Sequence, residues 1–299
     1  MKKSLKFLLF AGVFVALIGG LYALTGSSGK NEAFKPVDEF RLDAWIPLDL
    51  GFVDMSINKA VMYLFIAAIL TTVTMVWIAN RMAARPNRVQ TAVETLYQLM
   101  RKDITATNMD AKMAKTWFPF IGALFLFIWI SNLIGYLPLP TNTHHPVDIF
   151  GVEVPSFALY AATANISVTI ALTLVVWFSY HYVGIREKGV VKYVKGWIPG
   201  GISGAMVIPI FFIEVISQFV RVVSLSVRLF ANILAGHLLI LFMGGGLAVI
   251  LGLAALNVVT VPIAIVFFLF EIGLVATLQA FIFATLASIY LGEAVSDHH

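Results

Sequence analysis

Five long apolar segments decide what this chain can fold into. They lie at about residues 57–79, 117–139, 157–182, 205–243 and 255–291. Each reaches the roughly 20 residues that an α-helix needs to cross the core of a bilayer. Hydrophobic residues make up 60% of the sequence and charged residues 12%, whereas soluble domains have about 45–50% and about 25%. The sequence therefore predicts an all-α membrane protein with about five transmembrane helices, and it excludes a water-soluble domain.

The N-terminal part of the chain predicts a separate segment. In residues 1–29, three lysines precede an apolar stretch, and small residues follow it. This layout is typical of a signal peptide, and an uncleaved N-terminal anchor helix is the alternative. Residues 30–56 contain two prolines and six acidic groups, so we expect an exposed polar segment there. The membrane ion-channel domain is then expected at residues 57–299.

The connection between the first two apolar segments is expected to contain one more helix. Arg85, Pro86 and Asn87 indicate a turn, and residues 88–102 then place apolar side chains at helical spacing among Arg, Gln and Glu. This pattern predicts an amphipathic helix that lies in the membrane interface.

The basic residues predict the orientation of the chain. The connections 80–116 and 183–200 hold seven and four Lys or Arg residues, whereas 140–156 and 244–256 hold none. The positive-inside rule places the first two connections in the cytoplasm. The N-terminal segment is then outside and the C-terminus inside. This distribution explains the formal net charge of +4 without a nucleic-acid partner.

Four formally charged residues lie within the last two apolar segments. They are Glu214, Arg221 and Arg228 in the fourth segment and Glu271 in the fifth. Ionisable groups at this depth are expensive and by default mark an ion or substrate path. Both segments are also overlong, since 206–243 would make a helix of about 55 Å in a core of ~30 Å. We expect two long, tilted helices that form a hairpin.

One face of the helix expected in the fourth segment carries small side chains and a single arginine. Ser224, Arg228, Ala231, Asn232 and Ala235 follow one another at steps of three and four and so form one stripe. Small side chains allow the backbone of another helix to come close. We therefore expect Arg228 to face a partner.

The hairpin register predicts which polar residues lie at the same level. Facing positions of two antiparallel helices bring His237 level with Glu271, and Arg228 level with Gln279. The chain would reverse near residue 254, inside the connection that includes Gly244-Gly245-Gly246. His237 points about 180° away from Arg228 on its own helix.

Structural roles are the alternatives to an ion path. Arg228 could pair with Glu214, although about 21 Å of helix separates them, and Arg221 could extend its charge to the interface. His237 and Glu271 form either a proton relay or a mutually satisfied structural pair. Glu214 is either a path residue or a solvated group at a channel mouth.

The two last segments carry motifs that resemble a known family. Ser224-Leu-Ser-Val-Arg-Leu-Phe-Ala-Asn232, followed by Ala-Gly-His237, and the later Leu278-Gln-Ala-Phe-Ile-Phe283 resemble subunit a of bacterial F-type ATP synthases. The resemblance implies a stator subunit that holds a rotating c-subunit ring and contains two half-channels for protons, with Na⁺ as the alternative ion. It further implies b subunits of a peripheral stalk as partners and a bacterial plasma-membrane location.

The resemblance also assigns roles to the site residues. Arg228 is expected to face the c ring, Glu214 to lie in the cytoplasmic half-channel, and His237 with Glu271 in the opposite one. The remaining polar positions that match the family are Ser224, Asn232 and Gln279.

This sequence departs from the family pattern at two places. The family has the last-helix ionisable group seven residues before the glutamine, whereas Glu271 stands eight before Gln279. Either a local bulge near Gly273 or a shifted role would account for this. Asn165 also replaces an acidic residue that many family members have in the corresponding motif.

Two rival functions are less compatible with the sequence. A secondary transporter or a self-contained ion channel predicts internal repeats and broken helices, and neither is evident. A membrane enzyme predicts a motif such as Gly-x-Ser-x-Gly or His-Glu-x-x-His, and the chain has neither of these nor a phosphate-binding loop. Without cysteine, no thiolate metal site can form. We expect no cofactor and no metal.

Overall fold

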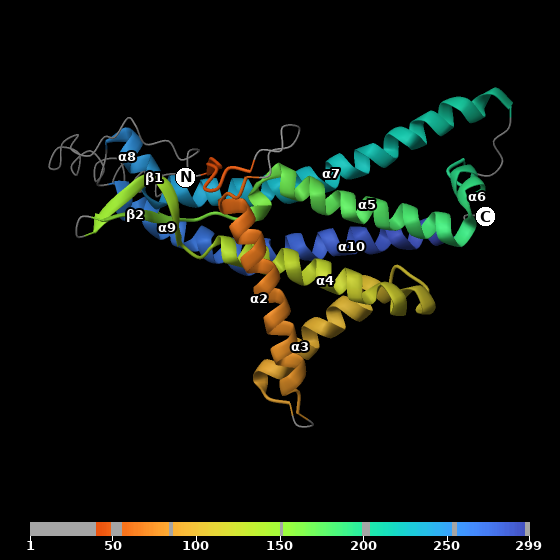
Figure 1. Ribbon diagram of the computed structural model, residues 1–299, viewed down its shortest axis with the longest axis horizontal. Helices are drawn as coiled ribbons and strands as arrows, with labels where there is room; N and C mark the ends of the chain where they lie inside the picture. Colours follow the sequence, from red (N-terminus) through yellow and green to blue (C-terminus); the bar gives the residue numbers. More distant parts are fainter. Residues whose placement is uncertain are drawn as a thin grey trace, which may run out of the picture. The chain divides into compact units, whose positions relative to one another are not determined.

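The computed structural model has five helices that are long and apolar enough to span a membrane. It describes residues 40–48, 56–83, 86–149, 152–198, 204–252 and 256–296. The five helices run over Lys59–Arg81 (α2), Ala111–Gly135 (α4), Ile166–Lys188 (α5), Val207–Ile250 and Asn257–Val295 (Figure 1). The predicted all-α membrane architecture is thus confirmed. The predicted signal or anchor at 1–29 and most of the polar segment 30–56 lie outside the described residues.

The chain divides into two compact units. The first comprises residues 1–42, 138–159 and 235–273, and the second comprises 43–137, 160–234 and 274–299. Two of the long helices therefore contribute to both units.

In the second unit, α4 is the central helix. It packs against α2 and against the last helix, Ala276–Val295 (α10), which also packs against α5. Along its apolar window α4 is 61% buried, whereas α2 is only 11% buried. Most of the apolar surface of α2 therefore remains available for lipid.

Close backbone contacts hold this unit together. A side chain added at Gly135 would meet Ala161, and one added at Gly292 would meet the backbone carbonyl of Asn108. Both glycines are therefore required by packing rather than by backbone conformation.

The predicted amphipathic helix is present and longer than expected. It begins at Arg88, where the Asn87 side chain accepts a hydrogen bond from the Gln90 N–H. It continues from α3 (Arg88–Gln98) into a π-helix, η2 (Leu99–Ala106). No residue of α3 is buried, whereas η2 buries Met100 and Ile104 and packs against α4.

The first unit contains a β-hairpin that the sequence analysis missed. Its strands are β1 (Leu139–Ile149) and β2 (Val152–Ala158), which pair antiparallel with register shifts on either side of Asn142. The hairpin occupies the connection between α4 and α5. It adds to the helical fold without replacing a predicted span.

The predicted chain reversal near residue 254 agrees with the structure, because one helical segment ends at Gly252 and the next begins at Asn257. Only the expectation that Gly244-Gly245-Gly246 belong to the connection itself is wrong. These residues belong to a π-helix, η5 (Phe242–Gly246), which joins α7 (Val207–Leu241) to α8 (Leu247–Leu251). Gly245, with φ of 159°, produces a kink there. The helical segment instead ends at Gly252, whose φ of 68° is left-handed and favours glycine.

A second π-helix interrupts the last long helix. This segment, η7 (Glu271–Val275), separates α9 (Asn257–Phe270) from α10 and contains Gly273. A π turn closes its hydrogen bonds from i to i+5 and so accommodates one more residue than an α turn. Of the two explanations for the spacing of Glu271 and Gln279, the local bulge near Gly273 is the one that this π-helix supports.

Candidate ion-path residues

The small-residue stripe on α7 is exposed. Ser224, Arg228, Ala231 and Asn232 are exposed, and we call these four residues the α7 stripe. Leu225, Leu229 and Ile233, on the other side of the helix, are between 0% and 2% exposed. One face of α7 therefore packs inside the unit, and the face that carries Arg228 does not.

Arg228 has no ionic partner within the described part of the chain. No hydrogen bond or ion pair joins its guanidinium to another described residue. The alternative of a structural pair with Glu214 is therefore wrong. Gln279, predicted to lie level with Arg228, is buried at 5% exposure, and no hydrogen bond joins the two among the described residues.

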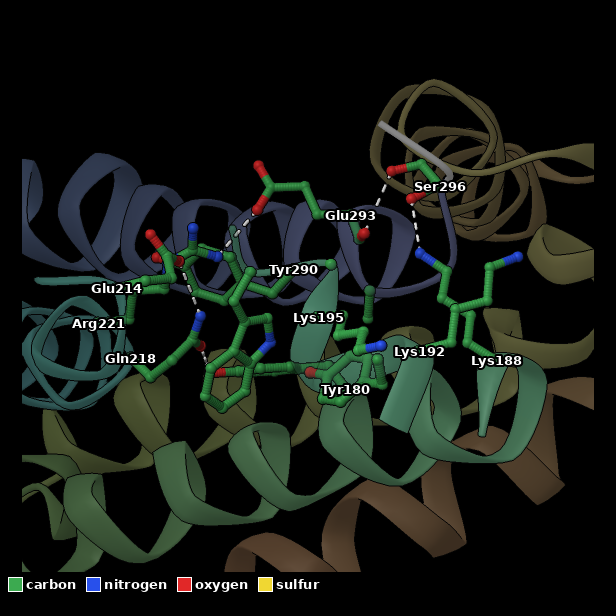
Figure 2. Close-up of a pocket in the computed structure, with 14 residues that line it drawn as sticks. Tyr180, Lys188, Lys192, Lys195, Glu214, Gln218, Arg221, Tyr290, Glu293 and Ser296 are labelled. Carbon is green, nitrogen blue, oxygen red and sulfur yellow. Dashed lines mark hydrogen bonds and ion pairs between the residues drawn. The ribbon is translucent and has the colours of Figure 1, made fainter. Parts of the chain in front are cut away.

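Glu214 lines a cavity of about 560 Å³ in the second unit. The helices α5, α7 and α10 and one short helix, α6 (Val190–Lys195), surround it (Figure 2). Its polar lining residues are Tyr180, Lys188, Lys192, Tyr193, Lys195, Glu214, Gln218, Arg221, Tyr290, Glu293 and Ser296. This mixture of carboxylates, hydroxyls and amines suits a water-filled space.

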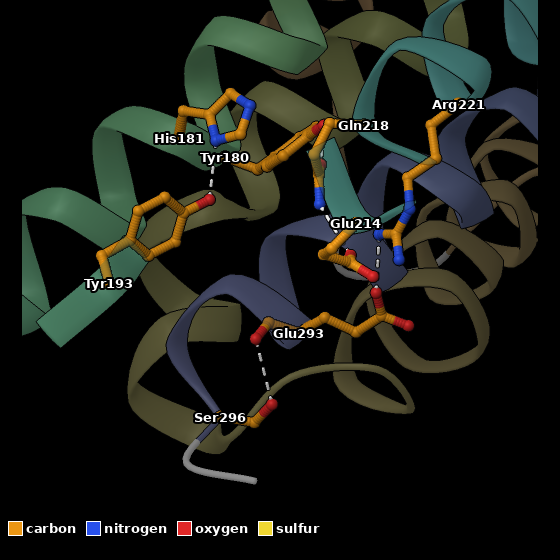
Figure 3. Close-up of polar contacts among 8 residues, drawn as sticks. All are labelled: Tyr180, His181, Tyr193, Glu214, Gln218, Arg221, Glu293 and Ser296. Carbon is orange, nitrogen blue, oxygen red and sulfur yellow. Dashed lines mark hydrogen bonds and ion pairs between the residues drawn. The ribbon is translucent and has the colours of Figure 1, made fainter. Parts of the chain in front are cut away.

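A chain of two hydrogen bonds orients Glu214. The Tyr180 hydroxyl donates to Gln218 Oε1 over 2.8 Å, and Gln218 Nε2 donates to Glu214 Oε1 over 3.1 Å (Figure 3). Gln218 is only 6% exposed, so its amide has little access to competing water. The sequence analysis missed Tyr180 and Gln218, although Glu214 and Gln218 are four residues apart and so share a helix face.

Arg221 is paired, which contradicts the expectation that it only extends its charge to the interface. Its Nη1 lies 2.8 Å from Glu293 Oε2, and its guanidinium carbon lies 5.0 Å from the centre of the Tyr290 ring. Both partners come from α10. The two arginines of α7 therefore differ, since Arg221 is held inside the unit and Arg228 is not.

The wall of the cavity that α6 forms is fixed by an aromatic contact. Tyr193 packs directly on Gly184 of α5, and its hydroxyl lies 2.7 Å from His181 Nδ1. Burial raises the pKa of the Tyr193 hydroxyl, so this group stays protonated and can donate to the imidazole. A side chain at position 184 would exclude the Tyr193 ring.

In the first unit, His237 and Glu271 are both buried. Their exposures are 0% and 7%. The Glu271 carboxylate lies against Gly236, where an added Cβ would clash with it. Since Gly236 precedes His237, the predicted hairpin register is confirmed at this level. The edge of the Phe40 ring also contacts His237, with ring centres 6.4 Å apart.

The first turn of α10, which directly follows η7, is hydrogen-bonded to α4. Asn132 Nδ2 donates to the Ala276 carbonyl over 3.2 Å, and Thr163 Oγ1 donates to Asn132 Oδ1 over 2.7 Å. All three residues are at most 1% exposed. Asn165, which stands in place of an acidic residue, caps α5 by accepting the Ser167 N–H.

Comparison with known proteins agrees with this architecture. The family model described as "ATP synthase A chain" matches residues 61–292. ATP synthase subunit a of Rubrobacter xylanophilus is 36% identical over 256 residues, which cover 85% of this chain and 90% of that protein. Subunit a of Brucella ovis is 30% identical over 272 residues, covering 88% and 98%. This chain therefore belongs to the ATP synthase subunit a family, the non-catalytic proton-channel stator subunits of the F-type ATP synthase membrane sector.

Proposed function

We propose that Arg228 is the residue that couples ion movement through this subunit to rotation of a c-subunit ring. The observation that carries the proposal is that Arg228 is exposed on a stripe of small and polar residues and has no ionic partner among the described residues. A permanent charge on a membrane-spanning helix requires a counter-charge. The ring carboxylates would supply it, and Ser224 and Asn232 would face the ring beside Arg228.

Two half-channels would bring ions to this stripe from opposite sides. We assign Glu214 and its cavity to the cytoplasmic half-channel. His237 and Glu271, with Gln279 further along the last helix, would form the opposite path. Imidazole titrates near neutrality, which suits it to a proton relay.

The physical basis of coupling is the energy of a buried charge. A protonated ring carboxylate is neutral and can turn through lipid. Transfer of an ionised carboxylate without a partner into lipid would cost several kcal/mol of free energy. Arg228 keeps its charge because a guanidinium group does not lose its proton in proteins. It would attract each returning carboxylate, favour proton release, and block direct leakage between the paths. The membrane potential supplies about 2.3 kcal/mol per charge per 100 mV.

The remaining assignments follow from the same proposal. We place the chain in a bacterial plasma membrane, with its N-terminal segment outside and its C-terminus in the cytoplasm. The c ring and the b subunits of a peripheral stalk would be its protein partners. Protons are the proposed ion, and Na⁺ remains the alternative because ligands on the ring determine the choice. The membrane ion-channel domain would begin near residue 57, after a signal or anchor at 1–29.

The test is replacement of the coupling arginine in the whole ATP synthase. In Arg228→Ala, we expect ATP-driven pumping and ATP synthesis to be lost while ATP hydrolysis by the detached catalytic sector is unchanged. Arg228→Lys should also fail, because the pKa of a lysine falls readily when it is desolvated. Pumping is followed by a pH-sensitive dye in inverted vesicles. Normal pumping in Arg228→Ala would reject the proposal.

A further inference from the structure

The cavity around Glu214 contains a charge pair that the proposed function does not use. Arg221 extends from α7 and Glu293 from α10, and both line the cavity (Figures 2 and 3). Glu214 and Glu293 are the carboxylates of the described lining. The pair therefore lies beside the proposed ion path.

The geometry of the pair holds Arg221 at the cavity wall. The guanidinium binds the Glu293 carboxylate over 2.8 Å, and the two side chains are 29% and 43% exposed. The guanidinium carbon of Arg221 lies over the Tyr290 ring, 5.0 Å from the ring centre. The pair thus contacts solvent in the cavity, and both of its members are anchored on membrane helices.

Without Glu293, this space would carry a strong excess of positive charge. Arg221 is permanently charged and is seven residues from Glu214, about 10 Å along the helix. Lys188, Lys192 and Lys195 also line the same cavity. An unpaired cation at this distance would repel a proton that approaches Glu214.

We propose that Glu293 is a positioning residue of the ion path, which neutralises Arg221 and holds it against Tyr290 so that protons can reach Glu214. The inference rests on the proposed role of Glu214 in the cytoplasmic path. It adds that the path depends on charge balance at its wall. The competing explanation is that the pair serves to tether α7 to α10. The two explanations predict different pumping rates for the double variant.

The experiment compares Glu293→Gln, Arg221→Gln and the double variant in the complete ATP synthase. Glu293→Gln leaves an unpaired cation and should lower ATP-driven pumping about tenfold, the factor expected for a unit charge roughly 10 Å away near a protein surface. Arg221→Gln and the double variant lack that cation and should both pump at close to the wild-type rate. Glu187→Gln is the matched control, because Glu187 is an exposed carboxylate near the end of α5 that does not line the cavity.

Recovery in the double variant would support neutralisation. If Arg221→Gln pumps as poorly as Glu293→Gln, or the double variant is no better than Glu293→Gln, the proposal is overturned. The pumping rate of Arg221→Gln distinguishes neutralisation from tethering even if Glu293→Gln reduces the amount of assembled enzyme. Higher salt should also partly restore pumping in Glu293→Gln, because exposed charges are screened; a lost tether would show no such relief.

Glu214→Gln, measured alongside, separates this inference from the proposed function. Loss of pumping in Glu214→Gln with normal pumping in Glu293→Gln would reject only the role of Glu293. Normal pumping in Glu214→Gln would reject the assignment of the path itself.

Discussion

At the scale of single residues, two arginines on one helix have opposite environments. Arg221 has an ion pair and an aromatic neighbour, whereas Arg228 is exposed and has no ionic partner among the described residues. Both were identifiable from the sequence as charges within an apolar segment. Their difference was not, because it depends on which residues of α10 lie opposite each one. Glu293 belongs to the polar end of the chain, where no local pattern indicates a pairing role.

The hydrogen-bond chain at Glu214 gives a prediction at this scale. Gln218→Leu removes the donor to the Glu214 carboxylate and leaves the Tyr180 hydroxyl without its acceptor. Hydrogen bonds to charged groups contribute about 1.5–3 kcal/mol, so we expect ATP-driven pumping to fall at least about tenfold.

The control for this prediction is Gln98→Leu, which makes the same change at an exposed position on α3. Equal pumping by the two variants in inverted vesicles would show that Gln218 does not orient Glu214.

At the scale of elements, the long helices were predictable and their irregularities only partly so. Apolar length alone identifies a span, because a bilayer requires about 20 such residues. The extra residue between Glu271 and Gln279 made a bulge near Gly273 one of two alternatives, and a π turn lies at Glu271–Val275. Glycines 244–246 are helical and not part of the connection between the two long helices, since a glycine run is compatible with a kinked π turn as well as with a loop.

The β-hairpin illustrates a different limit. Its strands contain Pro140, Pro146 and Pro155, and proline normally weakens a strand assignment. The alternation of Val147 to Ile149 and of Val152 to Val154 was a usable signal. The register shifts around Asn142 interrupt that alternation, so the sequence pattern was too short to predict the pairing.

Helix packing at Glu271 gives a prediction at the element scale. A Cβ at Gly236 would clash with the Glu271 carboxylate, whereas a Cβ at Gly244 would meet nothing within 4 Å. Gly236→Ala should therefore destabilise the subunit by about 1–3 kcal/mol, as overpacking does, and should impair pumping. Gly244→Ala is the matched control. Thermal unfolding of the purified complex measures the effect, and equal melting temperatures would contradict the packing argument.

At the scale of the whole molecule, the two proposed ion paths have their principal residues in different compact units. Glu214 and its cavity lie in the second unit, and His237 and Glu271 lie in the first. The residue types of both sites were predicted from charge at membrane depth and from family resemblance. Tyr180, Gln218 and Tyr193 were not, because their roles arise only when distant helices pack together.

The orientation of the chain gives a prediction at this scale. The sequence lacks cysteine, so a single introduced cysteine is a unique label. Lys195→Cys should react with a membrane-impermeant maleimide from the cytoplasmic side, and Leu137→Cys, 53% exposed at the end of α4, should react from the outside. Labelling of both positions from one side would contradict the proposed orientation.

The most direct test of the central claim is cysteine cross-linking between the α7 stripe and a c subunit in the assembled enzyme. Ala231→Cys lies on the exposed stripe, whereas Val73→Cys is an exposed position on α2, at 57% exposure. With a cysteine at mid-membrane on the c subunit, we predict disulfide formation from Ala231→Cys and none from Val73→Cys. Failure of Ala231→Cys to cross-link, or equal cross-linking by both, would contradict the account that the exposed arginine faces the ring.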